Sequence, residues 1–568
     1  MSMKISHILF VAILVQGGVN MRAAWAATEP SQAPLYSAVP GAKPNLMLVL
    51  DNSGSMGYEY PDSYSLLNTC KGGDGTVYLN GSWRNCSNYN KNGIESYYGW
   101  YSMRSNDFNL QYYNSAITYL PRVNANGVAQ SNPLVFIDNQ SSGQFSYSAP
   151  AAGYSINSGS DRFPLYTEYS STISAKGIFT YVRCAQGDCS VANRTQIDIS
   201  YPPNGNVNLP AGHSRTDCGK NATTCSKAQE LQNILNWYVW YRNRSLAVGT
   251  AIGQALQSYE NKFRIGYLQY NTIGNKSYAT ASSIQRGVRY FRDDAGNSIN
   301  KWKSQLYDWL YGIVPAGGTP SHQALSLVAD YYSGTNSYAG SSNVRSSYGN
   351  PWKNDPVSTS VENNAQDLAC RRSFAIVLSD GAWNKGTSIN ANSQYASIDG
   401  TQSFSGKPGG NSATLKYSPN GASGYNSSVL ATKLKARNLY IPYGDGNISS
   451  KGFADLTADF FWNRDFSKLD NNVLPLDGQY NPTFWQNLTT YTIGWGLTPS
   501  GDDGVVGGLT WAQINKYNND WLSGVASPVK PAWANGKSSV DLNSSNTDDS
   551  LRVNDFIRAG YTGGGASL

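Results

Sequence analysis

Histidine and charged residues are scarce in this chain of 568 residues. It has 3 histidines, and Asp, Glu, Lys and Arg together make up 14% of it, well below the share of about 25% in ordinary globular proteins. The scarcity of histidine excludes a His-rich metalloenzyme and leaves only His213 and His322 outside the first 26 residues for acid–base catalysis. The net charge of +6 is too small to indicate a nucleic acid or an anionic membrane as partner.

Long apolar runs are also lacking. No stretch of about 20 apolar residues follows residue 26, so we expect no transmembrane span in the mature chain. Residues 1–26 are typical of a secretory signal peptide: Lys4 gives a positive start, residues 8–15 are apolar, and Ala24-Trp25-Ala26 offers a small-x-small cleavage site. We therefore expect export, with an uncleaved anchor as the alternative.

Cysteine is the residue type whose distribution divides the chain. Of the 7 cysteines, only Cys370 lies after Ser226, and export favours disulfides. Neighbours in sequence form the preferred pairs, although other pairings stay open: Cys70 with Cys86, Cys184 with Cys189, and Cys218 with Cys225. Cys370 is left over, either as a buried free thiol or as a bridge to the earlier region. A zinc site is the alternative interpretation of these cysteines, but the Cys-x-x-Cys pair that is typical of such sites is not present.

Hydrophobic residues reach 40%, which is ample for a core, and two fully apolar runs predict central parallel strands. Residues 45–50 end at Asp51, and residues 373–378 end at Ser379-Asp380. Further strands are expected at 263–270 and 489–497, and helices within 226–256, 299–311, 320–332 and 453–462. This alternation predicts an α/β fold, with a mostly parallel sheet covered by helices on both faces.

Changes in composition along the chain predict its domain organisation. Residues 27–44 contain four prolines and are expected to form a linker. Residues 45–56 and 226–565 are assigned to the α/β domain. Residues 57–225, rich in Cys and Tyr, are interpreted as a loop-rich, disulfide-containing insertion with short strands near 134–137 and 178–182. Residues 385–450 are interpreted as a second polar insertion.

Three loops carry oxygen ligands to one edge of the predicted sheet. Asp51, Ser53 and Ser55 follow the first apolar strand, Thr319 lies in a Gly-Gly-Thr-Pro loop, and Asp380 follows the second apolar strand. In open α/β sheets, ligands bind at the carboxyl ends of the strands. This set offers hard oxygens, which suit Mg²⁺ or Mn²⁺, and leaves a coordination position for water or for a partner's carboxylate. The alternative is an Asx-type turn.

These motifs resemble the von Willebrand factor A domain, a Rossmann-like α/β fold, and its metal-ion-dependent adhesion site. The resemblance implies that the five residues named above hold the ion. Residues 370–384 resemble the third-loop signature of the PilC/PilY family of type IV pilus tip adhesins, and residues 454–471 and 485–494 resemble the segments that follow it there. The resemblance covers about 45–56 and 226–560, and excludes the insertion at 57–225.

The resemblance implies a non-catalytic adhesin and pilus assembly factor with a role in twitching motility. Minor pilins of the type IV pilus machinery are the implied partners, together with a host or surface ligand that offers a carboxylate. The implied location runs from the periplasm and outer membrane to the pilus tip and cell surface. The family usually continues into a C-terminal β-propeller, for which we find no blade-like repeat. The alternatives are an envelope scaffold, glycan binding by the Tyr-rich insertion and, last, a hydrolase.

Overall fold

The computed structural model describes the chain in segments. They cover residues 42–57, 76–79, 82–85, 105–107, 110–132, 134–138, 144–148, 178–184, 194–200, 202–271, 286–293, 301–334, 349–353, 367–380, 383, 453–462, 465–469, 473, 485–495, 497 and 549–568. The predicted signal peptide, nearly all of the predicted linker and the insertion at 385–450 lie outside these residues. Within them, no helix is both long and apolar enough to cross a membrane.

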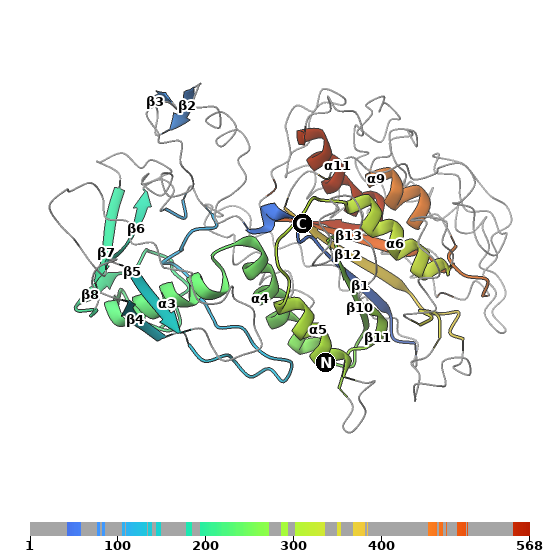
Figure 1. The fold of residues 1–568 in the computed structure, drawn as a ribbon, viewed down its shortest axis with the longest axis horizontal. Coiled ribbons are helices and arrows are strands. Elements are labelled where there is room, and N and C mark those ends of the chain that lie inside the picture. The colour runs from blue at the N-terminus through green and yellow to red at the C-terminus, as the bar shows by residue number, and fades with distance from the viewer. Residues whose placement is uncertain are drawn as a thin grey trace.

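A six-stranded sheet forms the centre of the molecule, in the order β11-β10-β1-β12-β13-β14 (Figure 1). Its strands are β1 (Asn45–Leu50), β10 (Arg264–Gln269), β11 (Arg286–Tyr290), β12 (Ser373–Ser379), β13 (Leu488–Gly494) and β14 (Gly564–Ser567). All neighbouring pairs are parallel except β10 with β11, which is antiparallel. The predicted α/β class with a mostly parallel sheet is therefore confirmed.

Helices cover both faces of this sheet (Figure 1). The helical segments are η1 (Gly54–Gly57), α3 (Lys227–Trp240), α4 (Arg244–Leu256), η5 (Gln257–Tyr259), α5 (Trp302–Tyr311), α6 (Ser321–Ser333), α9 (Phe453–Asp455), η9 (Leu456–Trp462) and α11 (Asp549–Thr562). The predicted helix at 453–462 begins as α-helix and continues as a π-helix from Leu456. There the Thr457 hydroxyl donates to the carbonyls of Ala454 and Ala559 at 3.1 and 2.9 Å, and such side-chain bonds compete with the regular helical pattern.

β1 shows why an all-apolar run becomes a central strand. Successive side chains of a strand point to opposite faces, and every residue of β1 is buried. Leu46, Leu48 and Leu50 join one apolar core with α4 and α5, whereas Met47 and Val49 join the other with α6, α9 and α11. The strand therefore contributes to both cores, and this fixes its place in the middle of the sheet.

The expected helical stretch before residue 256 is divided into two helices. Ser226 caps α3: its hydroxyl accepts from the backbone of Gln229, and the Gln229 side chain returns the bond, as the capping box in the sequence predicts. α3 ends at Trp240, and Asn243 then caps α4 by accepting from the backbone N–H of Leu246 at 2.9 Å. The new N-cap explains why one apolar pattern gives two helices.

The insertion contributes hairpins and a layer packed on α3. Its strands pair as β2 (Thr76–Leu79) with β3 (Ser82–Asn85), β4 (Leu134–Asp138) with β5 (Gln144–Ser148), β6 (Ile178–Cys184) with β7 (Arg194–Ser200), and β8 (Asn206–Asn208) with β9 (Thr224–Ser226). Tyr112 and Tyr113 stack edge-on against Trp237 of α3, with ring centroids 5.0 and 6.0 Å apart. The aromatic core on α3 thus includes side chains of the insertion, and the predicted domain boundary at 226 stays a prediction.

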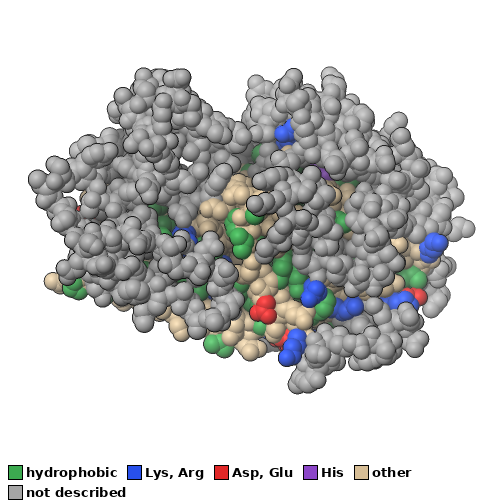
Figure 2. All heavy atoms as spheres, in the orientation of Figure 1, with side chains coloured by type: hydrophobic (Ala, Val, Ile, Leu, Met, Phe, Trp, Pro, Cys, Tyr) green, Lys and Arg blue, Asp and Glu red, His purple; other side chains and the backbone are tan. Residues whose placement is uncertain are grey.

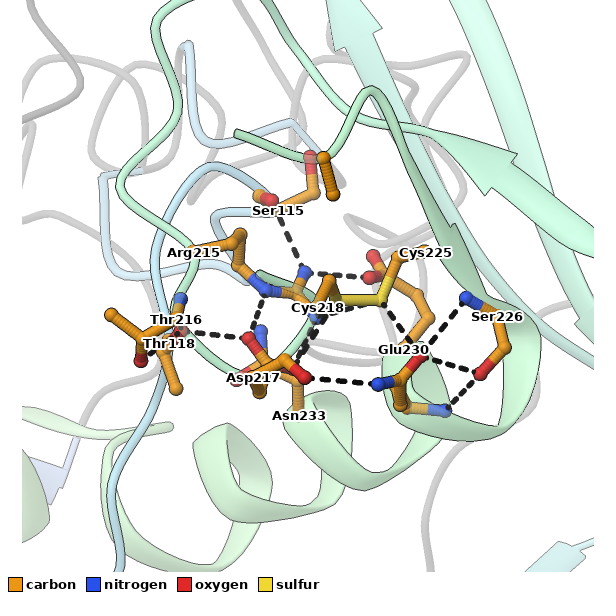
Figure 3. The surroundings of a disulfide bond; sticks show 12 residues. Ser115, Thr118, Arg215, Thr216, Asp217, Cys218, Cys225, Ser226, Glu230 and Asn233 are labelled. Carbon is orange, nitrogen blue, oxygen red and sulfur yellow. Dashed lines mark hydrogen bonds and ion pairs between the residues drawn. A yellow bond between two sulfur atoms is a disulfide. The ribbon is translucent and has the colours of Figure 1, made fainter. Parts of the chain in front are cut away.

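Two cysteine predictions can be compared with the structure. Cys218 and Cys225 form the predicted disulfide at the start of α3 (Figure 3), and Cys184 is also disulfide-bonded. Cys370 is a free thiol, as the first of its two predicted states requires, but it is half-buried rather than buried. On the face drawn in Figure 2, acidic and basic side chains of the described residues lie near one another along the lower edge of the view.

Candidate metal centre

The loop after β1 is held in a fixed conformation by its own aspartate. The backbone N–H of Asp51 donates to the carbonyl of Leu378 in β12 at 2.9 Å. One carboxylate oxygen of Asp51 accepts from the N–H of Ser53 at 2.7 Å, and the other accepts from the hydroxyl of Ser379 at 2.5 Å. Asp51 and Ser53 are each only 2% exposed. The first loop therefore presents its oxygens from a rigid, buried position.

Asp51 and Asp380 lie at the point where the order of strands in the sheet reverses. β1 and β12 are parallel neighbours, and the chain continues from β1 to β10 on one side before it returns to β12 on the other. Ligand sites of open α/β sheets form at such a switch point, beyond the carboxyl ends of the two strands. The topology thus brings together two aspartates that lie 329 positions apart in the sequence.

Three oxygens at this edge have the spacing of cation ligands. The hydroxyl oxygens of Ser53 and Ser55 lie 3.0 Å apart, and the Ser55 hydroxyl donates to a carboxylate oxygen of Asp380 at 3.0 Å. Adjacent ligands of an octahedral Mg²⁺, bound at about 2.0–2.1 Å, are about 3 Å from each other. The two distances match adjacent corners of such an octahedron.

The loop that carries Thr319 lies directly against the first loop. The N–H of Gly54 donates to the carbonyl of Gly317 at 3.1 Å, and the N–H of Ala316 donates to the carbonyl of Asn52 at 2.7 Å. Gly317 has a φ of 81°, which glycine adopts without strain. Thr319 itself is 8% exposed. All three predicted loops therefore reach one edge of the sheet, and hydrogen bonds join the first loop to each of the others.

The two histidines that the sequence leaves for catalysis have structural surroundings. The backbone N–H of Arg215 donates to a ring nitrogen of His213 at 3.1 Å. His322 lies inside the core and is only 2% exposed. Its ring packs edge-on against Trp383 and Phe453, with centroids 4.2 and 5.4 Å away. α6 therefore turns His322 toward the apolar layer that this helix shares with α9.

Comparison with known proteins gives relatives in one group. Over 87% of its length, the chain is 25% identical to the type IV pilus biogenesis factor PilY1 of Pseudomonas aeruginosa PAO1. It is 26% identical to PilY1 of strain PAK and 24% identical to PilY1 of strain UCBPP-PA14, over 84% of the chain in each case. The chain is thus similar to PilY1 over most of its own length. This confirms the family resemblance drawn from the segments around Asp380.

The chain spans about a third of the length of these PilY1 relatives: 36%, 34% and 33%. No family model matches the chain. No solved structure matches it either.

The two buried aspartates place negative charge close together at this edge of the sheet. Burial, followed by the charge of Asp380, raises the pKa of Asp51 from 3.8 to about 7, although hydrogen bonds from Ser379 and Ser53 oppose the rise. Burial and the charges of Asp51 and Asp380 also raise the pKa of the nearby Tyr270 hydroxyl. A bound cation would remove this cost, and the ligand set of carboxylates and hydroxyls suits a hard ion such as Mg²⁺ or Mn²⁺.

Three residues that contact the site were not among the residues predicted from the sequence. Ser379 fixes Asp51, and its position at the end of an apolar strand was a usable signal. Asn52 exchanges hydrogen bonds with the backbone of Asn271 at 2.7 and 2.8 Å, and so ties the first loop to the end of β10. Arg244, the first residue of α4, forms an ion pair with Asp380. No sequence signal connects it to a partner 136 positions away.

Proposed function

We propose that this chain is a non-catalytic type IV pilus factor that binds its partners through a divalent cation. Asp51, Ser53, Ser55, Thr319 and Asp380 would hold the ion, Mg²⁺ or Mn²⁺. The single observation that carries the metal site is the pair of 3.0 Å spacings from Ser55 to its two neighbours. The PilY1 relatives, described as type IV pilus biogenesis factors, support the place of action.

The proposed role of the protein is to orient the ligands and to leave one position for a partner. Asp51 is held by Ser53 and Ser379, so its carboxylate needs little reorganisation when an ion binds. The bound ion supplies an attraction for anionic oxygen. An acidic side chain of a minor pilin, or a carboxylate of a host or surface ligand, would complete the coordination shell. The proposed location is outside the cytoplasm, at the pilus tip and cell surface.

Partner capture in the presence and absence of the cation tests this function. Sheared pili or purified minor pilins are incubated with the immobilised chain in millimolar Mg²⁺ or in EDTA. We expect capture in Mg²⁺ and loss of capture in EDTA, in Asp51→Ala and in Asp380→Ala. Asp308→Ala is the matched control, because Asp308 is an exposed aspartate on α5. Capture that EDTA and both site variants leave unchanged would support a plain envelope scaffold instead.

A further inference from the structure

Arg244 is a buried cation at the candidate metal centre that the proposed function does not use. It is the first residue of α4, directly after the capping residue Asn243, so the start of the helix fixes its backbone. Arg244 is 2% exposed and Asp380 is 1% exposed. The guanidinium forms an ion pair with one carboxylate oxygen of Asp380, while the other oxygen accepts from Ser55 at 3.0 Å.

The two oxygens of Asp380 thus have different roles. One faces Ser55 and the proposed ion, and the other faces Arg244. A guanidinium stays charged at any pH a protein experiences, and burial keeps water and salt from screening it. It therefore repels a divalent ion that uses the same carboxylate. When no ion is bound, the same charge stabilises Asp380, because a buried carboxylate without a counter-ion is strongly unfavourable.

We propose that Arg244 is a built-in competitor of the metal ion. It keeps the metal-free centre folded and lowers the affinity of the centre for divalent cations, so that the centre loads at millimolar concentrations. This inference rests on the proposed function. Arg244 also gives the ion-bound centre a net positive charge, because an ion of charge +2 and one arginine together exceed the charge of two aspartates. That excess favours an anionic group as the partner ligand.

The test is isothermal titration of the purified chain with Mg²⁺, for the wild type, Arg244→Gln and Arg244→Lys. We expect Arg244→Gln to bind Mg²⁺ at least tenfold more tightly than the wild type, which corresponds to about 1.4 kcal/mol. Arg244→Lys keeps the charge and should stay within about threefold of the wild type. Arg286→Gln is the control for removing an arginine elsewhere, because Arg286 is exposed on the edge strand β11.

Thermal unfolding in EDTA gives a second readout. Arg244→Gln should unfold at a lower temperature than the wild type without metal and gain more from Mg²⁺. If Arg244→Gln folds only with Mg²⁺, the concentration that restores its circular dichroism takes the place of the titration, and a midpoint below the wild-type Kd supports the inference.

The outcomes separate this inference from the proposed function. Equal or weaker Mg²⁺ binding by Arg244→Gln, with the wild type still binding, overturns only the inference and makes Arg244 a residue that positions Asp380. Binding by Arg244→Gln alone supports the competition and overturns metal loading of the native chain. Absence of binding in every variant overturns both.

Discussion

Two clusters in the described part of this chain each combine one buried arginine with two carboxylates. They differ in whether the arginine contacts both carboxylates or only one. In the insertion, Arg215 contacts both of its acids: it donates to Glu230 at 2.6 Å and to the two oxygens of Asp217 at 2.8 and 2.7 Å (Figure 3). The second oxygen of Glu230 accepts from the hydroxyls of Tyr113 and Tyr181. Although burial opposes it, hydrogen bonding to Arg215 lowers the pKa of Asp217 below 3.8.

In the cluster at the edge of the sheet, the arginine is paired with only one of the two carboxylates. Arg244 pairs with Asp380, whereas Asp51 accepts hydrogen bonds from two uncharged groups, the N–H of Ser53 and the hydroxyl of Ser379. The pKa of Asp51 is raised to about 7. In the first cluster the arginine contacts both acids, whereas in the second Asp51 has no charged hydrogen-bond partner among the described residues, which is the arrangement that the proposed cation would complete.

Removal of Arg215 should have the largest effect on stability. Arg215→Met leaves the fully buried Glu230 without its counter-ion, and loss of one partner of a buried pair costs about 3–5 kcal/mol. Urea unfolding should show the same loss relative to the wild type in EDTA and in Mg²⁺, because an ion at the sheet edge would stabilise both proteins equally. Lys220→Ala, an exposed neighbour in sequence, should change stability by less than about 0.5 kcal/mol. A loss relative to the wild type that becomes smaller in Mg²⁺ would show that the two clusters are coupled.

The sheet-edge cluster should respond to pH through Asp51. Its pKa is about 7 in the folded chain, against an ordinary value of 3.8. Its contribution to stability is therefore fully present below about pH 4 and is lost as the pH rises through 7. Asp51→Asn stays neutral, so in EDTA its advantage over the wild type should grow from pH 4 to 7 and reach about 2–4 kcal/mol.

Unfolding temperatures of the wild type and Asp51→Asn in EDTA, measured across this pH range, check the prediction. In millimolar Mg²⁺ above pH 7 the order should reverse, because only the wild type gains from the ion. The exposed control Asp308→Asn should show no such trend. An advantage of Asp51→Asn that shrinks as the pH rises would contradict the buried, uncompensated charge.

The disulfide between Cys218 and Cys225 stabilises the cluster around Arg215. The guanidinium of Arg215 donates to the sulfur of Cys218 at 3.3 Å, and the bond to Cys225 closes a loop with a sequence separation of 7. The double variant Cys218→Ser/Cys225→Ser should lose about 2–3 kcal/mol, measured by urea unfolding, with Mg²⁺ binding unchanged. Cys370→Ser removes the free thiol and serves as the control. A changed Mg²⁺ affinity in the double variant would mean that the two clusters communicate.

The smallest expected effect concerns the start of α3, the helix that carries Glu230. Ser226→Ala removes the capping box with Gln229 and should cost about 1 kcal/mol. Thr223→Ala, an exposed change just before the helix, should cost less than half of that. Equal stability of the two variants would show that the hydrophobic layer on α3 alone fixes where the helix begins.

How much of this could be predicted from sequence depends on how far each signal reaches along the chain. The apolar runs of β1 and β12, each followed by an aspartate, predicted both the sheet and the approach of Asp51 to Asp380. The capping box at Ser226 was equally local. The ion pair of Arg244 was not predictable, because it depends on where α4 packs. The packing of Tyr113 on α3 was not predictable either, because the sequence around an aromatic residue in a polar segment does not indicate which residue it will contact.

The most direct test of the central claim is to locate the ion itself. Crystals of the chain grown with Mn²⁺ give an anomalous difference map that marks manganese positions without ambiguity. The proposal predicts one peak beyond the carboxyl ends of β1 and β12, within about 2.3 Å of the hydroxyl oxygens of Ser53 and Ser55. Absence of a peak at this edge in millimolar Mn²⁺, with Arg244 still paired to Asp380, would contradict it.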